Sequence, residues 1–179
     1  WNQVREAERA KALKDLDQGL RSNFMQTDAQ FVAGASVLIS RSEYVRRKAE
    51  FVQQWVRESI PGARAEVAQV PDLHQAASIG TIHAHAQIIA RAGSGKTETI
   101  ANRAVFLMKH CGVSPGEMLL LAFNRKAAEE LEARIASKLK GRATPHIFTF
   151  HALALAIVGR QQDLIRNTEG EGDQSLSRE

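Results

Sequence analysis

The chain has 179 residues, of which 44% are hydrophobic and 25% charged, and its formal net charge at pH 7 is +4. This composition is typical of a globular protein of one domain or one and a half, and it excludes an intrinsically disordered chain. No apolar run approaches membrane-spanning length and no charged-then-apolar leader opens the chain, so we expect a cytoplasmic protein. The single cysteine, Cys111, excludes an internal disulfide, and we expect it to pack as a small apolar residue at a helix end.

Residues 1–68 are predicted to be an all-helical N-terminal segment. An apolar stripe at spacings of three and four residues indicates the first helix: Leu13, Leu16, Leu20 and Phe24. A second helix is predicted to begin at Ser40, where Glu43 completes a capping box, and to end at Pro61 and Gly62. We expect the aromatic residues of this second helix to belong to a core or a docking surface rather than to a ligand site: Tyr44, Phe51 and Trp55.

Residues 90–97 carry the most specific signal in the chain: Ala90, Arg91, Ala92, Gly93, Ser94, Gly95, Lys96 and Thr97. The stretch fits a relaxed form of a phosphate-binding loop, in which glycines let backbone N–H groups converge on an anion. The lysine then meets the β- and γ-phosphate oxygens, and the threonine hydroxyl holds Mg²⁺. A short apolar run over 86–90 predicts a buried strand entering the loop. Helical spacing over 96–110, ended by Gly112, predicts a helix leaving it.

Strands and helices continue to alternate after this loop. We predict a strand over 117–123, a helix over 125–139, a third strand over 146–149 and a helix over 151–158. This order implies right-handed crossovers and a parallel sheet with ligands at the strand ends. The predicted fold class is therefore α/β, a nucleotide-binding core over residues 69–158.

Charge is distributed unevenly over the second half of the chain. Residues 125–142 hold six basic and three acidic side chains, and the sequence pI is about 9.5. The excess fits a polyanionic partner, although charge alone is explained as well by a solvated helix face. Residues 159–179 are polar, with five acidic and three basic side chains and no apolar period, and we expect a loose tail there.

Four short motifs stand in a fixed order along residues 71–158. They are Gln75, the loop at 90–97, Leu-Ala-Phe-Asn-Arg-Lys-Ala-Ala-Glu-Glu-Leu at 121–131, and Thr-Phe-His-Ala-Leu-Ala at 149–154. In order and spacing they resemble the first motifs of UvrD/Rep-like superfamily 1 DNA helicases, and within them the bacterial DNA helicase IV subfamily. The resemblance implies a partial RecA-like domain with a parallel sheet (helicase core domain 1A, motifs Q, I, Ia and Ib), preceded by the all-helical segment.

The resemblance also implies ATP and Mg²⁺ as cofactors. Gln75 stands 21 residues before Lys96, where these helicases place a glutamine that reads the adenine edge, and it would precede the first strand. Lys96 would neutralise charge on the β- and γ-phosphates, and Thr97 would hold Mg²⁺, as the two catalytic residues of this half of the site.

Single-stranded DNA is the partner that the resemblance implies. Phe123 would stack on an unpaired base, and Arg125 and Lys126 would meet backbone phosphates. A second contact with the same strand is implied for Thr149, Phe150 and His151.

Two departures from the family pattern affect these expectations. Glu98 stands where the family often has a basic residue of the adenine pocket. The chain also contains no Asp-Glu-x-Gln segment, which would hold Mg²⁺ and orient the attacking water. We therefore expect the N-terminal part of a longer ATP-dependent 3′-to-5′ DNA helicase, with the polarity taken only from the family. The remaining helicase domains, or a protein partner, would act with it, and this chain alone would turn ATP over negligibly.

Two other functions remain open from the sequence. The chain could be another phosphate-loop NTPase, such as a GTPase or a small-molecule kinase, although Asn124-Arg125-Lys126-Ala127 does not supply the Asn-Lys-x-Asp that reads guanine. It could also be a non-catalytic module that binds DNA or a partner protein.

Overall fold

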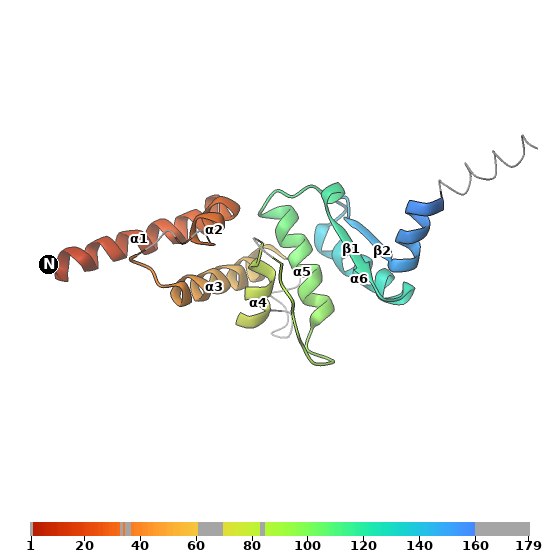
Figure 1. The fold of residues 1–179 in the computed structure, drawn as a ribbon, viewed down its shortest axis with the longest axis horizontal. Helices are drawn as coiled ribbons and strands as arrows, with labels where there is room; N and C mark the ends of the chain where they lie inside the picture. The colour runs from red at the N-terminus through yellow and green to blue at the C-terminus, as the bar shows by residue number, and fades with distance from the viewer. Residues whose placement is uncertain (1, 33, 35–36, 61–69, 83–84, 160–179) are drawn as a thin grey trace, which may run out of the picture.

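The computed structural model describes residues 2–32, 34, 37–60, 70–82 and 85–159. Its elements, in chain order, are α1 (Asn2–Ser22), α2 (Phe24–Val32), α3 (Arg41–Ser59), α4 (Leu73–Gly80), α5 (Lys96–Lys109), η2 (Pro115–Glu117), β1 (Leu119–Ala122), α6 (Arg125–Leu139) and β2 (His146–Thr149). Residues 150–159 form a further helix. The predicted α/β class with an N-terminal helical segment is confirmed, although helices dominate (Figure 1). Residues 160–179 of the tail predicted over 159–179, and the helix end predicted at Pro61 and Gly62, lie outside the described residues.

The first predicted helix is divided at Asn23 into α1 and α2. The side chain of Asn23 faces the new helix start, because its Oδ1 accepts a hydrogen bond from the backbone N–H of Gln26 (3.4 Å). The two helices also approach closely at Gly19, where a Cβ would lie 2.5 Å from Thr27 Oγ1. The apolar stripe still faces inward across the break, since Leu16, Leu20 and Phe24 are all buried.

Helix α3 begins where the sequence predicts. Ser40 is its N-cap residue, and the Ser40 hydroxyl accepts from the backbone N–H of Glu43 at 3.2 Å. The aromatic side chains of this helix lie in or against the core, which confirms the core interpretation. Tyr44 is buried and stacks on Phe31 with ring centroids 4.5 Å apart, and Trp55 packs against the core.

One hydrophobic core extends across both halves of the described chain. It includes buried side chains of α1–α3 together with Ala76 and Ile79 of α4 and apolar residues of α5 and α6. Phe106 of α5 is fully buried, and its ring meets those of Phe24 at 4.9 Å and Trp55 at 5.0 Å, both edge to face. The N-terminal helices therefore bury one face of α5, the helix that follows the predicted phosphate-binding loop. None of the described helices is both long enough and apolar enough to cross a membrane.

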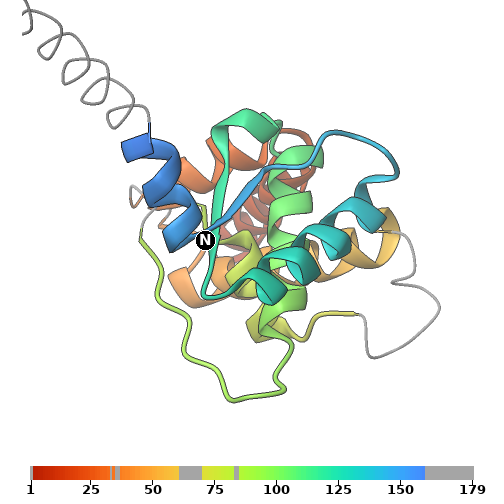
Figure 2. The ribbon, with the colours of Figure 1, turned by 90° about the vertical axis from the view of Figure 1, so that its right-hand side faces the viewer.

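In the described residues the sheet has two of the three predicted strands, and they are parallel as predicted, with Leu119 opposite His146 and Ala122 opposite Thr149. β1 starts two residues later than expected, because Pro115–Glu117 forms a 3₁₀ turn that precedes it. The apolar composition of this strand does not make it fully buried. Leu119 and Leu121 are 51% and 38% exposed, since they share a face of the sheet that no described element covers fully. The two strands lie side by side, and the helix of residues 150–159 continues from β2 (Figure 2).

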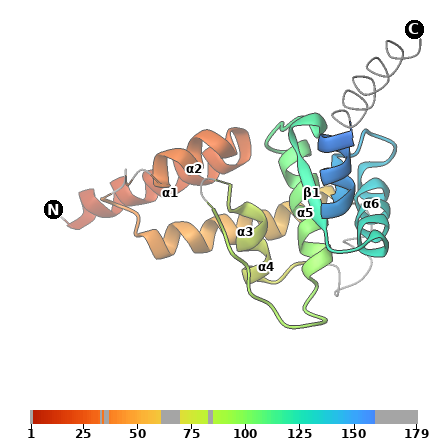
Figure 3. The ribbon, with the colours of Figure 1, turned by 45° about the vertical axis from the view of Figure 1, so that its right-hand side comes forward.

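The strand predicted over 86–90 is also absent. Residues 85–91 have no regular secondary structure and are exposed, with Ile89 at 89%. A strand forms only when its backbone hydrogen-bonds to a neighbouring strand. In the part of the chain that the structure describes, β1 and β2 pair only with each other, so residues 86–90 have no strand partner. Figure 3 shows the segment as an extended arm that leads from α4 to the start of α5.

Candidate functional site

The loop before α5 is a tight turn, not a continuation of the helix. Gly93 and Gly95 have φ angles of +77° and +75°, in the left-handed region that favours glycine. Within the turn, the backbone N–H and the hydroxyl of Ser94 both donate to the carbonyl oxygen of Arg91, at 3.3 and 2.8 Å. Ala90, Arg91 and Ala92 are exposed on its approach. The glycine positions of the phosphate-loop prediction therefore match the backbone that such a loop requires.

The turn ends at the N-terminus of α5. Gly95 is the N-cap residue, and no described side chain caps the helix. The first backbone N–H bonded within the helix is that of Thr99, to the carbonyl oxygen of Gly95 at 2.8 Å. The N–H groups of Lys96, Thr97 and Glu98 precede it and have no helical acceptor. Together with the positive end of the helix dipole, they favour an anion in front of this turn.

Lys96 folds back across the loop. Its Nζ donates to the carbonyl oxygens of Arg91 at 2.6 Å and Ala90 at 3.2 Å. An ammonium group has three donors, so one is left for a ligand even in this conformation. Thr97, the predicted Mg²⁺ ligand, is half-buried one residue further into the helix.

Gln75 connects α4 to the loop. The sequence pattern did not predict α4. α4 begins at Asp72, whose side chain accepts from the backbone N–H groups of His74 and Gln75, both at 2.8 Å. The Gln75 side chain completes this capping box, because its Oε1 accepts from the Asp72 N–H at 3.0 Å, and its Nε2 donates to the Ser94 carbonyl oxygen at 2.9 Å. Gln75 therefore lies within a helix, and the strand that it was expected to precede, over 86–90, is absent. The Asp-x-x-Gln spacing of the box was the signal that could have revealed the helix.

The other end of α4 is fixed to α5 by Arg103. Its Nη1 donates to the carbonyl oxygens of Ser78 at 2.8 Å and Ile79 at 3.0 Å. Burial lowers the pKa of the Arg103 guanidinium. α4 is thus held at its first turn by the loop and at its last turn by the helix that leaves the loop.

A cavity of about 520 Å³ opens between α4, the arm over 87–90 and the first turn of α5. Gln75, Ser94 and Lys96 supply polar groups to its lining, and Ile88 and Ile100 supply apolar surface. Volume and lining are in the range of sites for cofactors and small ligands. Of the nine predicted nucleotide-site residues, Gln75, Ala90, Ser94 and Lys96 line this cavity, whereas Thr97 does not.

Glu98 does not line that cavity, because its carboxylate points toward α6. Oε1 accepts from Lys138 Nζ at 2.5 Å, and Oε2 accepts from Arg134 Nη1 at 3.0 Å. Hydrogen bonds to Glu130 and then Glu98 raise the pKa of Arg134. The residue that departs from the family pattern is therefore engaged in an ion bridge between two helices.

The predicted DNA-contacting residues gather at the carboxyl ends of the two strands. Because Ala122 is opposite Thr149, the residues that follow them, Phe123 and Phe150, leave the sheet at neighbouring positions. The two side chains are 90% and 60% exposed. Exposed aromatic rings at one sheet edge are the kind of platform on which unpaired bases stack.

Polar residues are close to the two phenylalanines in the chain. Arg125 and Lys126 begin α6 and are exposed, and Arg125 Nε contacts Glu129 Oε1 at 2.8 Å. His151 is exposed in the helix after β2. Thr149 has a structural role there, because its Oγ1 accepts from the Ala152 N–H at 3.2 Å and so caps that helix.

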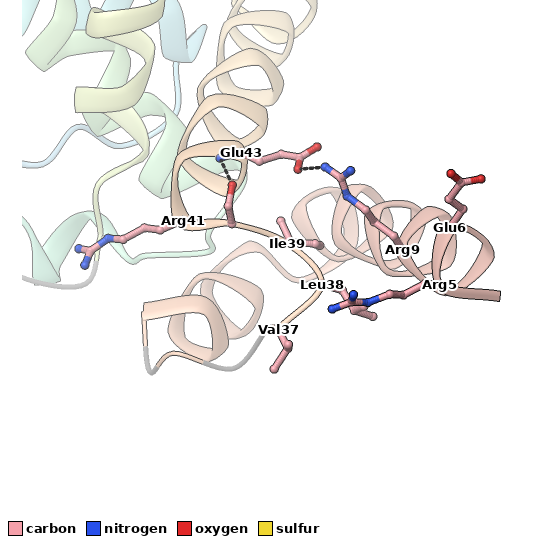
Figure 4. A pocket seen from close by; sticks show the side chains of 9 residues that line it. Arg5, Glu6, Arg9, Val37, Leu38, Ile39, Arg41 and Glu43 are labelled. Atoms are coloured by element: carbon pink, nitrogen blue, oxygen red, sulfur yellow. Dashed lines mark hydrogen bonds and ion pairs between the residues drawn. The ribbon is translucent and has the colours of Figure 1, made fainter. Parts of the chain in front are cut away.

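A second cavity, of about 560 Å³, lies at the other end of the molecule, between α1 and the residues before α3 (Figure 4). Arg9 reaches from α1 to Glu43, with Nη2 2.6 Å from Oε2, and this hydrogen bond lowers the pKa of Glu43. None of the predicted site residues lines this cavity.

The parallel strand pair and the surrounding helices define an α/β fragment with an N-terminal helical segment, and comparison with known proteins identifies its family. Residues 71–175, more than half of the chain, match the UvrD/REP helicase N-terminal domain. The chain belongs to the UvrD/REP helicase family.

Individual relatives agree with this assignment. The chain is 49% identical to DNA helicase IV of Escherichia coli (strain K12) over 73 residues, which are 40% of this chain and 10% of that protein. It is 33% identical to the ATP-dependent DNA helicase Rep of Buchnera aphidicola subsp. Schizaphis graminum (strain Sg) over 97 residues, 53% of this chain and 15% of the relative. With the ATP-dependent DNA helicase PcrA of Leuconostoc citreum it shares 38% identity over 93 residues, 51% of this chain and 12% of that protein. The matches thus span only 10–15% of the length of these relatives.

Proposed function

We propose that this chain is the ATP- and single-stranded-DNA-binding N-terminal part of an ATP-dependent DNA helicase. The observation that carries the proposal is the turn at 93–97, which opens onto the 520 Å³ cavity and is held there by Gln75. The Rep and PcrA relatives are named ATP-dependent DNA helicases, which supports the same function for a longer protein that contains this chain.

We propose one orientation for ATP in the cavity. The triphosphate lies against the free N–H groups at the start of α5, with Lys96 turning from the Ala90 and Arg91 carbonyls toward the β- and γ-phosphates. Gln75 keeps one amide N–H and one carbonyl lone pair unused by Asp72 and Ser94, and these can read the adenine edge.

Mg²⁺ requires oxygen ligands, and the first turn of α5 supplies one. Thr97 follows Lys96 in that turn, and we propose that its hydroxyl would hold the ion together with phosphate oxygens. Bound Mg²⁺ would neutralise part of the charge on the phosphates. Glu98 is excluded from this role because Arg134 and Lys138 already use both of its oxygens.

Single-stranded DNA is proposed to lie across the edge formed by Phe123 and Phe150. Stacking on the two exposed rings requires no particular base. Arg125, Lys126 and His151 stand beside the rings and would meet the backbone. Hydrolysis and unwinding, with the 3′-to-5′ polarity of the family, are assigned to the longer protein, since this chain has no Asp-Glu-x-Gln segment.

The nucleotide half of the proposal is tested by titrating the chain with a fluorescent, non-hydrolysable ATP analogue in the presence of Mg²⁺. We expect saturable binding that ATP displaces better than GTP, and at least about tenfold weaker binding for Lys96→Ala, about 1.4 kcal/mol. Lys11→Ala, which removes an exposed lysine of α1, should leave the affinity unchanged. Preferential displacement by GTP would favour another NTPase, and binding that survives Lys96→Ala would contradict the assigned site.

The DNA half is tested by fluorescence anisotropy with a labelled oligothymidylate. We expect binding that weakens with salt, and a loss of about 1–3 kcal/mol for Phe123→Ala and for Phe150→Ala. Val4→Ala is the control, because it removes a side chain that is 63% exposed in α1, a helix that carries none of the proposed DNA-contacting residues. If the wild-type chain does not bind the oligonucleotide, a partner-binding module becomes the better explanation.

A further inference from the structure

Glu98, Arg134 and Lys138 form the ion bridge that joins the phosphate-loop helix to α6. The two Glu98 oxygens accept from different cations, Lys138 Nζ at 2.5 Å and Arg134 Nη1 at 3.0 Å. Arg134 in turn binds Glu130 through Nη2 at 2.7 Å. Glu98 is the second residue after Lys96, so the bridge is attached directly to the turn that faces the cavity.

Because this bridge is largely buried, each of its charges depends on its partner more than the charges of a surface ion pair do. The Lys138 side chain is only 9% exposed, and that of Glu98 is 24% exposed. An ammonium group that is removed from water needs a counter-charge, and Glu98 supplies it. Loss of either partner would leave the other charge poorly solvated, so the bridge fixes the separation of the two helices at this point.

The bridge also controls where a negative charge lies. A free carboxylate at position 98 would stand beside the proposed triphosphate and repel it. Arg134 and Lys138 neutralise the Glu98 carboxylate and direct it toward α6 instead. The proposed phosphates would repel the Glu98 carboxylate, and the cations of α6 attract it away from them.

α6 connects this bridge to the strand edge. Its 15 residues make a rod about 22 Å long, packed on α5 through a buried face that includes Leu131 and Ile135. The helix begins immediately after Phe123 and Asn124, and Asn124 Oδ1 caps it by accepting from the Ala127 N–H at 2.8 Å. A shift of the first turn of α5 that moves Arg134 and Lys138 must therefore move the start of α6 as well.

We propose that Glu98 is a positioning residue that, through Arg134 and Lys138, couples occupation of the phosphate loop to single-stranded DNA binding at the Phe123 and Phe150 edge. The inference rests on the proposed function, because it needs both ligands to bind. Glu98, which departs from the family pattern, would thus couple the binding affinities of the two sites.

The experiment measures the oligothymidylate affinity of the chain with and without saturating ATP analogue and Mg²⁺, and the analogue affinity with and without the oligonucleotide. We expect the two ratios to agree and to be at least about fivefold in the wild type. Glu98→Gln and Lys138→Met should each reduce the ratio to below about twofold, and the double variant should resemble the single ones because both remove the same link.

Two measurements separate coupling from general damage. Thermal unfolding of each variant is recorded, and Glu50→Gln, which breaks the exposed Arg46–Glu50 pair of α3 at 2.6 Å, is the carboxylate control that should keep the wild-type ratio. A wild-type chain that binds both ligands with no coupling, or a folded Glu98→Gln variant with the wild-type ratio, would overturn this inference alone. A wild-type chain that binds neither ligand would instead overturn the proposed function on which it rests.

Discussion

Gln75 and Ser94 are joined by a hydrogen bond of 2.9 Å from the side-chain amide of the first to the backbone carbonyl oxygen of the second. The contact spans 19 residues and holds the first turn of α4 against the phosphate loop. Because Gln75 also closes the capping box of α4 through Asp72, one side chain fixes the helix start and the loop together. The glutamine that the family resemblance assigns to the adenine is thus also part of the support of the loop.

Changing Gln75 to Glu should weaken nucleotide binding without unfolding the chain. The new carboxylate cannot donate to the Ser94 carbonyl oxygen and repels it, a loss on the order of 1 kcal/mol that corresponds to roughly five- to tenfold in affinity. The measurement is ATP-analogue titration beside thermal unfolding. Gln26→Glu is the matched control, since Gln26 is exposed and its Oε1 serves only as an acceptor from Asn23 Nδ2. Equal affinities for Gln75→Glu and the wild type would show that this contact does not support the site.

Gly95→Ala should damage the loop in two ways. Position 95 has a φ of +75°, and this backbone conformation is about 1–2 kcal/mol less favourable for alanine than for glycine. The added Cβ would also lie 3.0 Å from Gln75 Nε2. We expect a lower free energy of unfolding in urea and a loss of analogue binding. Gly116→Ala, where a Cβ meets nothing within 4 Å and φ is not positive, is the control and should change neither quantity. A Gly95→Ala variant that binds normally would mean that the turn adopts another backbone in solution.

Phe24→Ala should destabilise the nucleotide half of the chain although Phe24 lies in the N-terminal segment. The Phe24 ring is buried against Phe106 of α5 at 4.9 Å, and truncation of a buried phenylalanine typically costs about 3–5 kcal/mol. Urea unfolding followed by tryptophan fluorescence measures the loss. Val32→Ala, at an exposed position of α2, should change stability by less than about 0.5 kcal/mol. If α5 stays protected from hydrogen exchange in Phe24→Ala, the two halves do not share a cooperative core.

Cys111 should be nearly inert toward thiol reagents at pH 8 while the protein is folded. Burial raises the pKa of its thiol from 9.0 to about 12, so the reactive thiolate is about a thousandfold rarer than in the unfolded chain. Between pH 9 and 12 the unfolded thiol loses its proton while the folded one keeps it. The contribution of this group to stability is therefore complete below pH 9 and is lost as the pH rises. Labelling rates with and without urea test this, and equal rates at pH 8 would contradict it.

Local signals in the sequence predicted most elements correctly, because each depends on residues close together in the chain. Ser40 capping predicted the start of α3, and helical spacing gave α6 its observed bounds. The run over 146–149 predicted β2. The glycines at 93 and 95 were identified as loop residues from their spacing alone, and both adopt the backbone that only glycine tolerates readily.

Long-range contacts explain what the sequence could not predict. The run over 86–90 has the composition of a buried strand, yet a strand needs a partner, and the described chain supplies none. Only the folded chain shows that Glu98 faces Arg134 and Lys138, 36 and 40 residues away, because charge patterns carry no information about distance in space.

The sequence by itself determined the family, the glycine positions of the turn before α5 and the α/β order, since motifs and periodicity are properties of neighbouring residues. Tertiary structure decided that Gln75 supports the loop, that Phe123 and Phe150 share an edge, and that the N-terminal helices bury one face of α5. Each of these relationships joins residues far apart in the chain. Packing and hydrogen bonding that form only on folding bring them together.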